Sequence, residues 1–288
     1  MRFGILSPVV FRPPGQFSPW EAAAGPAELV RVAVAADRLG YHHLTCSEHV
    51  GVPVRIAARA GGTYWDPLAT LGFLAAHTTR IRLATHVLVL GYHHPLAIAK
   101  RYGTLDLLSG GRVVLGLGVG SLAEEFALLG ADFDGRGAAA DDAIAAIRAA
   151  WGRAVPEYEG THYAFRDFLV DPHAPRTRVP LWIGGYTARS LRRAAELADA
   201  WVPFGLPPER IGAMLAAVER PAGFEVVLNP PPLDPIAEPG EARRHVEQFH
   251  AAGATMLNIV LRHRSAEHCV EQLEALRRLF PEAFDAGA

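Results

Sequence analysis

The sequence predicts a single (β/α)8 barrel domain spanning residues 1–288. Eight short apolar runs alternate with helical segments along the chain, which is the pattern of repeated strand–helix units. The chain has 288 residues and is 50% hydrophobic, which is enough for one large core. A glycine-rich run, Gly116 to Gly120, ends one of the apolar runs, and the carboxyl ends of barrel strands are where such folds hold their ligands.

The expected strands lie at residues 2–7, 43–47, 81–89, 112–118, 181–184, 200–204, 224–229 and 256–262. Helices are expected between them at 27–39, 67–77, 188–198 and 241–252, and glycine follows two of these, at Gly40 and Gly253. Gly110-Gly111 ends another helix before the fourth strand, since glycine readily adopts left-handed backbone angles. The elements therefore follow one another as a barrel requires.

Two intervals are too long for ordinary connections between a strand and a helix. Residues 50–65 follow the second strand. Residues 121–180 follow the fourth, and contain an alanine-rich helix at 138–151 and an irregular aromatic segment at 156–180. We expect both to lie over the carboxyl-terminal face, where long loops carry function. Tyr64, Trp65 and Tyr158 lie in these intervals, and Tyr92 lies in the loop after the third strand. All four are expected to line a substrate pocket.

Composition excludes several classes of function. The 28 basic and 30 acidic residues are interspersed and the net charge is -2, which argues against nucleic-acid or membrane binding and favours a small-molecule partner. The chain lacks both a signal-type start and a continuous apolar run of about 18 residues, so we expect a cytoplasmic protein. Cys46 and Cys269 are far apart, which argues against a disulfide framework or a cysteine metal site.

Residues 181–190 place two glycines between an apolar strand and the start of a helix. The amides of Gly184, Gly185, Tyr186 and Thr187 could bind phosphate there, because bare N–H groups and the helix dipole both favour an anion. A tight turn capped by Thr187 explains the same pattern. Both interpretations stay open on these residues alone.

Glu48 and His49 follow the second strand and should point into the barrel mouth. An imidazole can donate or accept a proton near pH 7, so His49 is a candidate acid–base residue. The alternative is a loop histidine bonded to a neighbouring carboxylate. Glu125 stands in the first turn of a helix after the glycine run, where its charge either offsets the helix dipole or contacts a cofactor.

A cluster of histidines, His86, His93 and His94, raises the possibility of a metal site. His93 and His94 point apart, and no carboxylate recurs at ligand spacing. We therefore expect no metal.

Taken together, these segments resemble the luciferase-like monooxygenase superfamily, a family of flavin and deazaflavin (β/α)8 barrels, and are most similar to its coenzyme F420-dependent branch. The resemblance covers nearly the whole chain. It depends on six fragments in order, at residues 40–49, 95–100, 104–112, 116–130, 180–185 and 194–201.

This resemblance implies roles for the candidate residues. Glu48 and His49 would lie beside the cofactor ring and the substrate, and the amides of residues 184–187 would hold the cofactor phosphate. His86-Val87 matches a bulge with a cis peptide bond behind the ring. The remaining implied cofactor contacts are Gly118, Gly120, Ser121 and Glu125.

The chain departs from its relatives at two of these positions. His86 stands where a small residue is usual, and Ser121 stands where relatives carry tryptophan or a catalytic acid. The sugar-phosphate reaction of some relatives therefore cannot be transferred to this chain, and His49 is left as the acid–base candidate.

The sequence thus favours an F420-dependent oxidoreductase that moves a hydride between the deazaflavin and a small organic substrate. The resemblance also implies a homodimer. An FMN-dependent monooxygenase supplied by a separate reductase is the first alternative. A barrel that binds a phosphorylated metabolite without catalysis and a metal-dependent hydrolase are the others.

Overall fold

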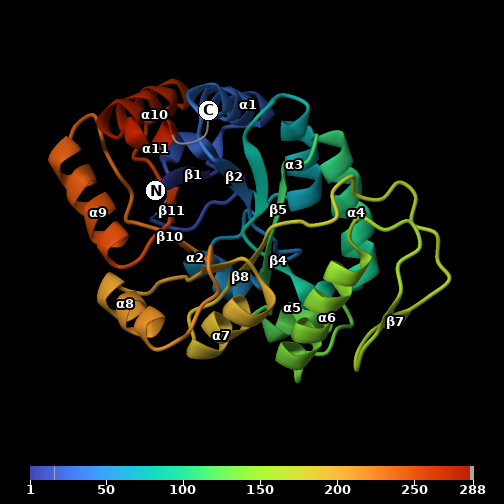
Figure 1. The fold of residues 1–288 in the computed structure, drawn as a ribbon. Coiled ribbons are helices and arrows are strands. Elements are labelled where there is room, and N and C mark those ends of the chain that lie inside the picture. Colours follow the sequence, from blue (N-terminus) through green and yellow to red (C-terminus); the bar gives the residue numbers. More distant parts are fainter. Residues whose placement is uncertain (16, 286–288) are drawn as a thin grey trace.

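Parallel strands close into a barrel in the computed structural model, which describes residues 1–15 and 17–285 (Figure 1). The order around the barrel is β3-β2-β1-β11-β10-β9-β8-β5-β4, and pairing of β3 with β5 closes it. Because β3 and β4 are two parts of one interrupted strand, the barrel has the eight strands expected from the apolar runs. They are β1 (Arg2–Leu6), β2 (His43–Cys46), β3 (Arg82–Thr85), β4 (Leu88–Val89), β5 (Val113–Gly118), β8 (Leu181–Gly184), β9 (Ala200–Val202), β10 (Glu225–Leu228) and β11 (Met256–Ile259).

Helices surround the barrel, and the expected ones are confirmed to within two residues at each end. Ends of this kind are set by caps: the Thr187 hydroxyl accepts from the Ser190 amide at the start of α7. The helices are α1 (Pro26–Leu39), α2 (Val54–Ala60), α3 (Pro67–Ala75), α4 (Pro95–Leu108), α5 (Ala123–Leu128), α6 (Arg136–Ala150), α7 (Ala188–Leu197), α8 (Pro208–Ala216), α9 (Pro239–Ala251), α10 (Ala266–Leu279) and α11 (Glu282–Asp285), with short 3-10 turns η1 (Pro19–Ala22) and η2 (Leu90–Tyr92).

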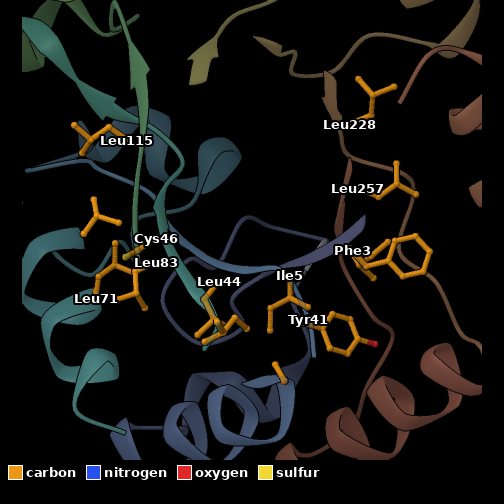
Figure 2. Packing of buried hydrophobic residues seen from close by; sticks show 14 of the residues in the cluster. Phe3, Ile5, Tyr41, Leu44, Cys46, Leu71, Leu83, Leu115, Leu228 and Leu257 are labelled. Atoms are coloured by element: carbon orange, nitrogen blue, oxygen red, sulfur yellow. The ribbon is translucent and has the colours of Figure 1, made fainter. Parts of the chain in front are cut away.

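The largest hydrophobic cluster lies between the strands and the helices. Alternate residues of a strand face opposite sides, so Phe3 and Ile5 of β1 pack outward, whereas Gly4 between them meets the ring of His43 inside the barrel. Figure 2 shows Ile5, Leu44 and Tyr41 gathered between the first strands and the helices beside them. The largest hydrophobic core therefore lies outside the barrel, and the barrel interior contains polar groups such as His43.

The third strand is interrupted by a cis peptide bond between His86 and Val87, as the resemblance implied. The His86 amide still donates to the carbonyl of Cys46 in β2, at 2.8 Å. Beyond the interruption, β4 pairs with the end of β5, through Leu88 with Leu117. The bulge therefore lies at the carboxyl-terminal end of the barrel.

The segment expected over the mouth at residues 156–180 lies elsewhere. It contains a hairpin, β6 (Tyr158–Glu159) with β7 (Ala164–Phe165), and Phe165 packs against Ala99 of α4 and Ala146 of α6. In Figure 1 this yellow-green segment projects at the side of α4 and α6. The expectation was wrong because the aromatic residues of the segment bury themselves against the outer helices.

Within residues 1–15 and 17–285, no helix combines the length and the apolarity needed to cross a membrane.

Candidate active site

A cavity of about 1350 Å³ opens at the carboxyl-terminal end of the barrel. Pockets for one small ligand usually measure about 300–1000 Å³. This cavity is larger, so it has room for two molecules. Residues at or just beyond the ends of all eight strands line it, among them Leu6, His49, Val87, Gly118, Gly184, Phe204, Asn229 and Val260.

His49 lines this cavity, and its orientation is fixed from behind. Its Nδ1 lies 2.7 Å from a carboxylate oxygen of Glu125, whose side chain is fully buried. The ring of Tyr64 packs edge-on against the imidazole, at 4.5 Å between centroids. With Nδ1 engaged, Nε2 is the nitrogen left to exchange a proton with a bound molecule.

Glu125 is the acceptor for four hydrogen bonds from the loops around it. Besides His49, the donors are the Val50 amide at 2.6 Å, the Gly51 amide at 3.2 Å and the Tyr92 hydroxyl at 2.7 Å. Burial acts to raise the pKa of Glu125, but the bonds from Tyr92, His49 and Gly51 outweigh it and lower that pKa. Glu125 is therefore a buried carboxylate that is stabilised in its charged form.

The cofactor contact expected for Glu125 stays a prediction. The structure places its side chain behind His49 and not in the cavity lining. It instead joins the start of α5 to the loop after β2. Sequence reasoning missed this role because the partners lie 33 to 76 residues from Glu125 along the chain.

The catalytic role expected for Glu48 also stays a prediction, and the structure shows which groups bind its carboxylate. One carboxylate oxygen accepts from the Val89 amide at 2.6 Å, and the other lies 2.7 Å from Nε2 of His93. Both oxygens are thus engaged by β4 and the loop after it. Although Glu48 lines the cavity, these contacts give it the work of holding the bulged strand in place.

Two of the expected pocket residues line the cavity. Tyr64 forms one wall with Phe11, whose ring lies 4.9 Å away. Burial, with the charge of Glu125, raises the pKa of Tyr64 to about 12, so its phenol stays protonated and can donate a hydrogen bond. Tyr92 lines the cavity while donating to Glu125.

The other two expected pocket residues lie away from the cavity. Trp65 packs against the main hydrophobic cluster, and its backbone amide donates to the Val10 carbonyl at 3.0 Å. Tyr158 belongs to the outer hairpin and donates to Asp142 of α6. An aromatic side chain in a long loop predicts a pocket residue. In both cases the side chain instead packs against an element distant in the sequence.

The glycines of the mouth line the cavity, but the barrel itself requires them. A Cβ on Gly118 would meet a side-chain methyl of Val87 at 2.6 Å, and one on Gly184 would meet the Phe204 ring at 2.8 Å. A Cβ on Gly116 would collide with the Thr85 carbonyl oxygen. These strands therefore approach the bulge and its neighbours more closely than any side chain allows.

Next to these glycines lies the part of the cavity where the sequence suggests that an anion binds. We call it the anion-binding corner and define it as residues 184–187 with Arg136, Arg189 and Arg193. All of its members line the cavity. Arg193 binds Asp141, and Nε of Arg136 donates to the Gly120 carbonyl at 3.1 Å. Arg189 has no ion pair or hydrogen bond with any residue that the structure describes. This corner combines the start of α7 with a free guanidinium.

The three arginines were not among the residues predicted from the sequence. The spacing of Arg189 and Arg193, one turn apart after the two glycines, was the available signal. Arg136 could not be found in this way, because only the packing of α6 beside α7 brings it to the same corner.

His86 forms part of the cavity wall beside the bulge. Its side chain is buried, and burial lowers its pKa to about 4, so the imidazole is neutral at pH 7. Its ring packs edge-on against Phe204 at 5.2 Å. Its Nε2 has no hydrogen-bond partner among the described residues. Ser121 lies at the rim of the cavity and is exposed.

Residues 1–274 match the family described as luciferase-like monooxygenase, and the chain belongs to that family. A curated relative is the F420-dependent glucose-6-phosphate dehydrogenase of Microbacterium testaceum, 31% identical over 182 residues, which are 62% of this chain and 52% of that protein.

Solved structures share the fold. The monooxygenase RslO1 from Streptomyces bottropensis has a TM-score of 0.73 and 24% identity over 98% of each chain. An F420-dependent secondary alcohol dehydrogenase, in complex with an F420-acetone adduct, has a TM-score of 0.76 and 14% identity over 99% of each chain.

Proposed function

We propose that this protein is a coenzyme F420-dependent oxidoreductase that transfers a hydride between the deazaflavin and a small organic substrate. The observation that carries the proposal is the pairing of His49 with the buried Glu125 at one side of a cavity large enough for two molecules. The anion-binding corner lies at the same cavity. The F420-dependent relative from Microbacterium testaceum supports this choice of cofactor.

The residues at the mouth fit a flat cofactor that carries a phosphate. The Arg189 guanidinium and the Tyr186 amide, which has no hydrogen-bond partner among the described residues, offer donors to an anion. The Gly185 amide already donates to the Val202 carbonyl and the Thr187 amide to the Ser190 hydroxyl, so these two are not open donors. Gly118 and Gly120 line the cavity next to the bulge, where Val87 packs on Gly118, and Phe126 and Val89 pack on Gly120. The unpartnered Nε2 of His86 is the kind of buried polar atom that a bound molecule can satisfy after a small movement of the side chain. Together these features favour a cofactor in this half of the mouth.

The bound deazaflavin would supply two-electron hydride chemistry. In alcohol oxidation, Nε2 of His49 would accept the proton of the substrate hydroxyl. In ketone reduction, the same nitrogen would return a proton to the carbonyl oxygen. Glu125 stabilises the positively charged imidazole in both directions, because its carboxylate accepts from Nδ1.

Binding decides the cofactor. Purified protein is titrated with oxidised coenzyme F420, reduced coenzyme F420 and FMN, and the change in cofactor fluorescence or absorbance is followed. We expect micromolar binding of coenzyme F420 and weaker binding of FMN. Tight binding of FMN alone, with oxygen consumption when reduced FMN is supplied, would instead identify a flavin-dependent monooxygenase.

A matched pair of variants tests where the phosphate lies. Arg189→Ala should weaken binding of coenzyme F420 by roughly 10-fold, as expected for loss of one charge-assisted hydrogen bond. Arg192→Ala, on the same helix but outside the cavity, should leave binding unchanged. Equal affinity of both variants and the unmodified protein would contradict the assignment of this corner.

A further inference from the structure

The charges that line the cavity are unevenly distributed. Its three arginines all belong to α6 and α7, in the anion-binding corner. The only carboxylate in the lining that the structure describes is that of Glu48, and both of its oxygens are engaged by Val89 and His93. The cavity is therefore positive at one end and has no free charged carboxylate.

The cavity wall beyond the ends of β1, β10 and β11 carries no charge on its described residues, in contrast to the anion-binding corner. We call it the apolar wall and define it by Leu6, Phe11, Val260 and the three prolines 230–232. Within the described part of the chain, no Lys, Arg, Asp or Glu lies in the cavity lining that follows these three strands. His49 borders this wall, because β2 is the neighbour of β1. A molecule at His49 that extends over β1 and β11 would therefore meet an uncharged surface.

A polar side chain, that of Asn229, lies at the edge of the apolar wall. Asn229 stands directly after β10, and its Oδ1 is buried without a hydrogen-bond partner among the described residues. A buried amide oxygen without a partner costs about 1–3 kcal/mol. A ligand in the cavity would remove that cost after a rotation of the Asn229 side chain, because the oxygen itself is not exposed to the cavity. Two strands, β1 and β11, separate the ends of β2 and β10. His49 and Asn229 therefore border the apolar wall from opposite sides.

From this arrangement we infer the chemical class of the substrate: an uncharged molecule with an oxygen at the reacting carbon, an apolar middle and a second neutral polar group. The reacting oxygen faces His49, the middle lies on Leu6 and Val260, and the second group hydrogen-bonds to the Asn229 amide. This inference rests on the proposed function for its reaction, but it concerns a different half of the cavity.

The physical reason for excluding anions is desolvation. A carboxylate or phosphate placed on the apolar wall would lose water without meeting a cation, and that cost is far larger than the gain from apolar contact. A hydroxyl or amide loses less, because Asn229 replaces part of its hydration. Sugar phosphates are therefore poor candidates for this half of the cavity.

The test uses three matched ketones: benzylacetone, its para-hydroxy derivative and its para-carboxy derivative. They share the carbonyl and the apolar middle and differ only at the far end. Binding is measured by calorimetry, with and without saturating oxidised coenzyme F420. We expect the hydroxy derivative to bind about 5-fold more tightly than benzylacetone, the effect of one neutral hydrogen bond. The carboxy derivative should bind at least about 10-fold more weakly than benzylacetone.

Variants locate the second group. Asn229→Leu should remove the preference for the hydroxy derivative, while affinity for benzylacetone and for coenzyme F420 stays unchanged, which also shows that the variant is folded. Gln248→Leu is the matched control, since this amide lines the cavity but is exposed. It should keep the preference.

Three results would overturn the inference: tightest binding of the carboxy derivative, a hydroxy preference that survives in Asn229→Leu, or binding of coenzyme F420 with no binding of any ketone. Failure of the proposed function has a different signature. In that case the ketones bind in the expected order, while coenzyme F420 does not bind.

Discussion

Glu48 and Glu125 are two buried carboxylates at the same barrel mouth, and each holds a histidine at 2.7 Å. Glu48 holds His93, which does not line the cavity. Glu125 holds His49, which does. The same pair of residue types therefore does structural work in one place and offers proton transfer in the other, and access of the histidine to the cavity makes the difference.

The two carboxylates also accept hydrogen bonds from different backbone segments. Glu48 accepts from the Val89 amide and so fixes the strand that carries the bulge. Glu125 accepts from the Val50 and Gly51 amides and so fixes the loop that carries His49. A carboxylate at a strand end is thus not itself a sign of catalysis; its partners decide its role.

The largest effect on kcat is expected when His49, rather than His93, is replaced by asparagine. His49→Asn should lower kcat by about 100-fold or more, because general acid–base catalysis contributes about 100- to 10000-fold. His93→Asn should lower kcat by less than about 5-fold. Steady-state kinetics with coenzyme F420 and a secondary alcohol measures both. Similar losses for the two variants would mean that cavity access does not separate the two pairs.

The carboxylates themselves give the next effect. Glu125→Gln should reduce kcat by about 10- to 100-fold, because the imidazolium formed during the reaction loses its counter-charge. In alcohol oxidation the acidic limb of the pH–rate profile should move to lower pH. A merely structural role would leave the limb in place.

Glu48→Gln is the control for this change. It should leave the pH–rate profile unmoved. The protein should lose some stability, because the NH2 group of Gln cannot accept the hydrogen bond that one Glu48 oxygen accepts from the Val89 amide or from His93. Glu125→Asp, which keeps the charge on a shorter side chain, should restore part of the rate and the original position of the acidic limb. An acidic limb that moves equally in Glu48→Gln and Glu125→Gln would remove the distinction between the pairs.

The dependence of stability on acid pH should report the charge of Glu125. Because its pKa is lowered on folding, Glu125 binds a proton more readily in the unfolded chain. Its contribution to the free energy of unfolding is present above the ordinary glutamate pKa of 4.5 and is lost as pH falls through the lowered value. Urea unfolding at a series of pH values should show a smaller loss in the acid range for Glu125→Gln than for the unmodified protein.

The smallest effect is expected at Tyr92. Tyr92→Phe removes one of the four hydrogen bonds to Glu125, the one from the hydroxyl at 2.7 Å. One such bond to a charged group contributes about 1.5–3 kcal/mol to stability. The rate should fall by only about 3-fold, since His49 keeps its own bond to Glu125. Thermal unfolding and kcat are both measured, and a rate loss as large as that of Glu125→Gln would give Tyr92 a direct part in the reaction.

The strands and most helices could be predicted because their signals are local. Apolar runs such as 113–118 and 256–259 are short and continuous, and a parallel strand buried on both faces requires that pattern. Short-range signals also placed His49 and residues 184–187 at strand ends, where they line the cavity. Local patterning was therefore sufficient for the barrel and for the location of its mouth.

The features that could not be predicted concern residues whose role depends on distant partners. Glu125 was expected along a cofactor, and only the structure shows that it is buried under His49, through bonds to a loop more than 70 residues earlier. Tyr158 was expected in the pocket and instead joins an outer hairpin on α4 and α6. Nothing near these residues in the sequence identifies the surface on which they pack.

The sequence by itself determined the barrel, its family and the ring of strand ends from which the site is built, because periodicity and glycine placement act over a few residues. Only the tertiary structure decided which histidine faces the cavity and which carboxylate lies behind it. It also decided that the arginines gather at one end and Asn229 at the other. These features depend on contacts between strands and helices far apart in the chain, and close packing, not local propensity, sets such contacts.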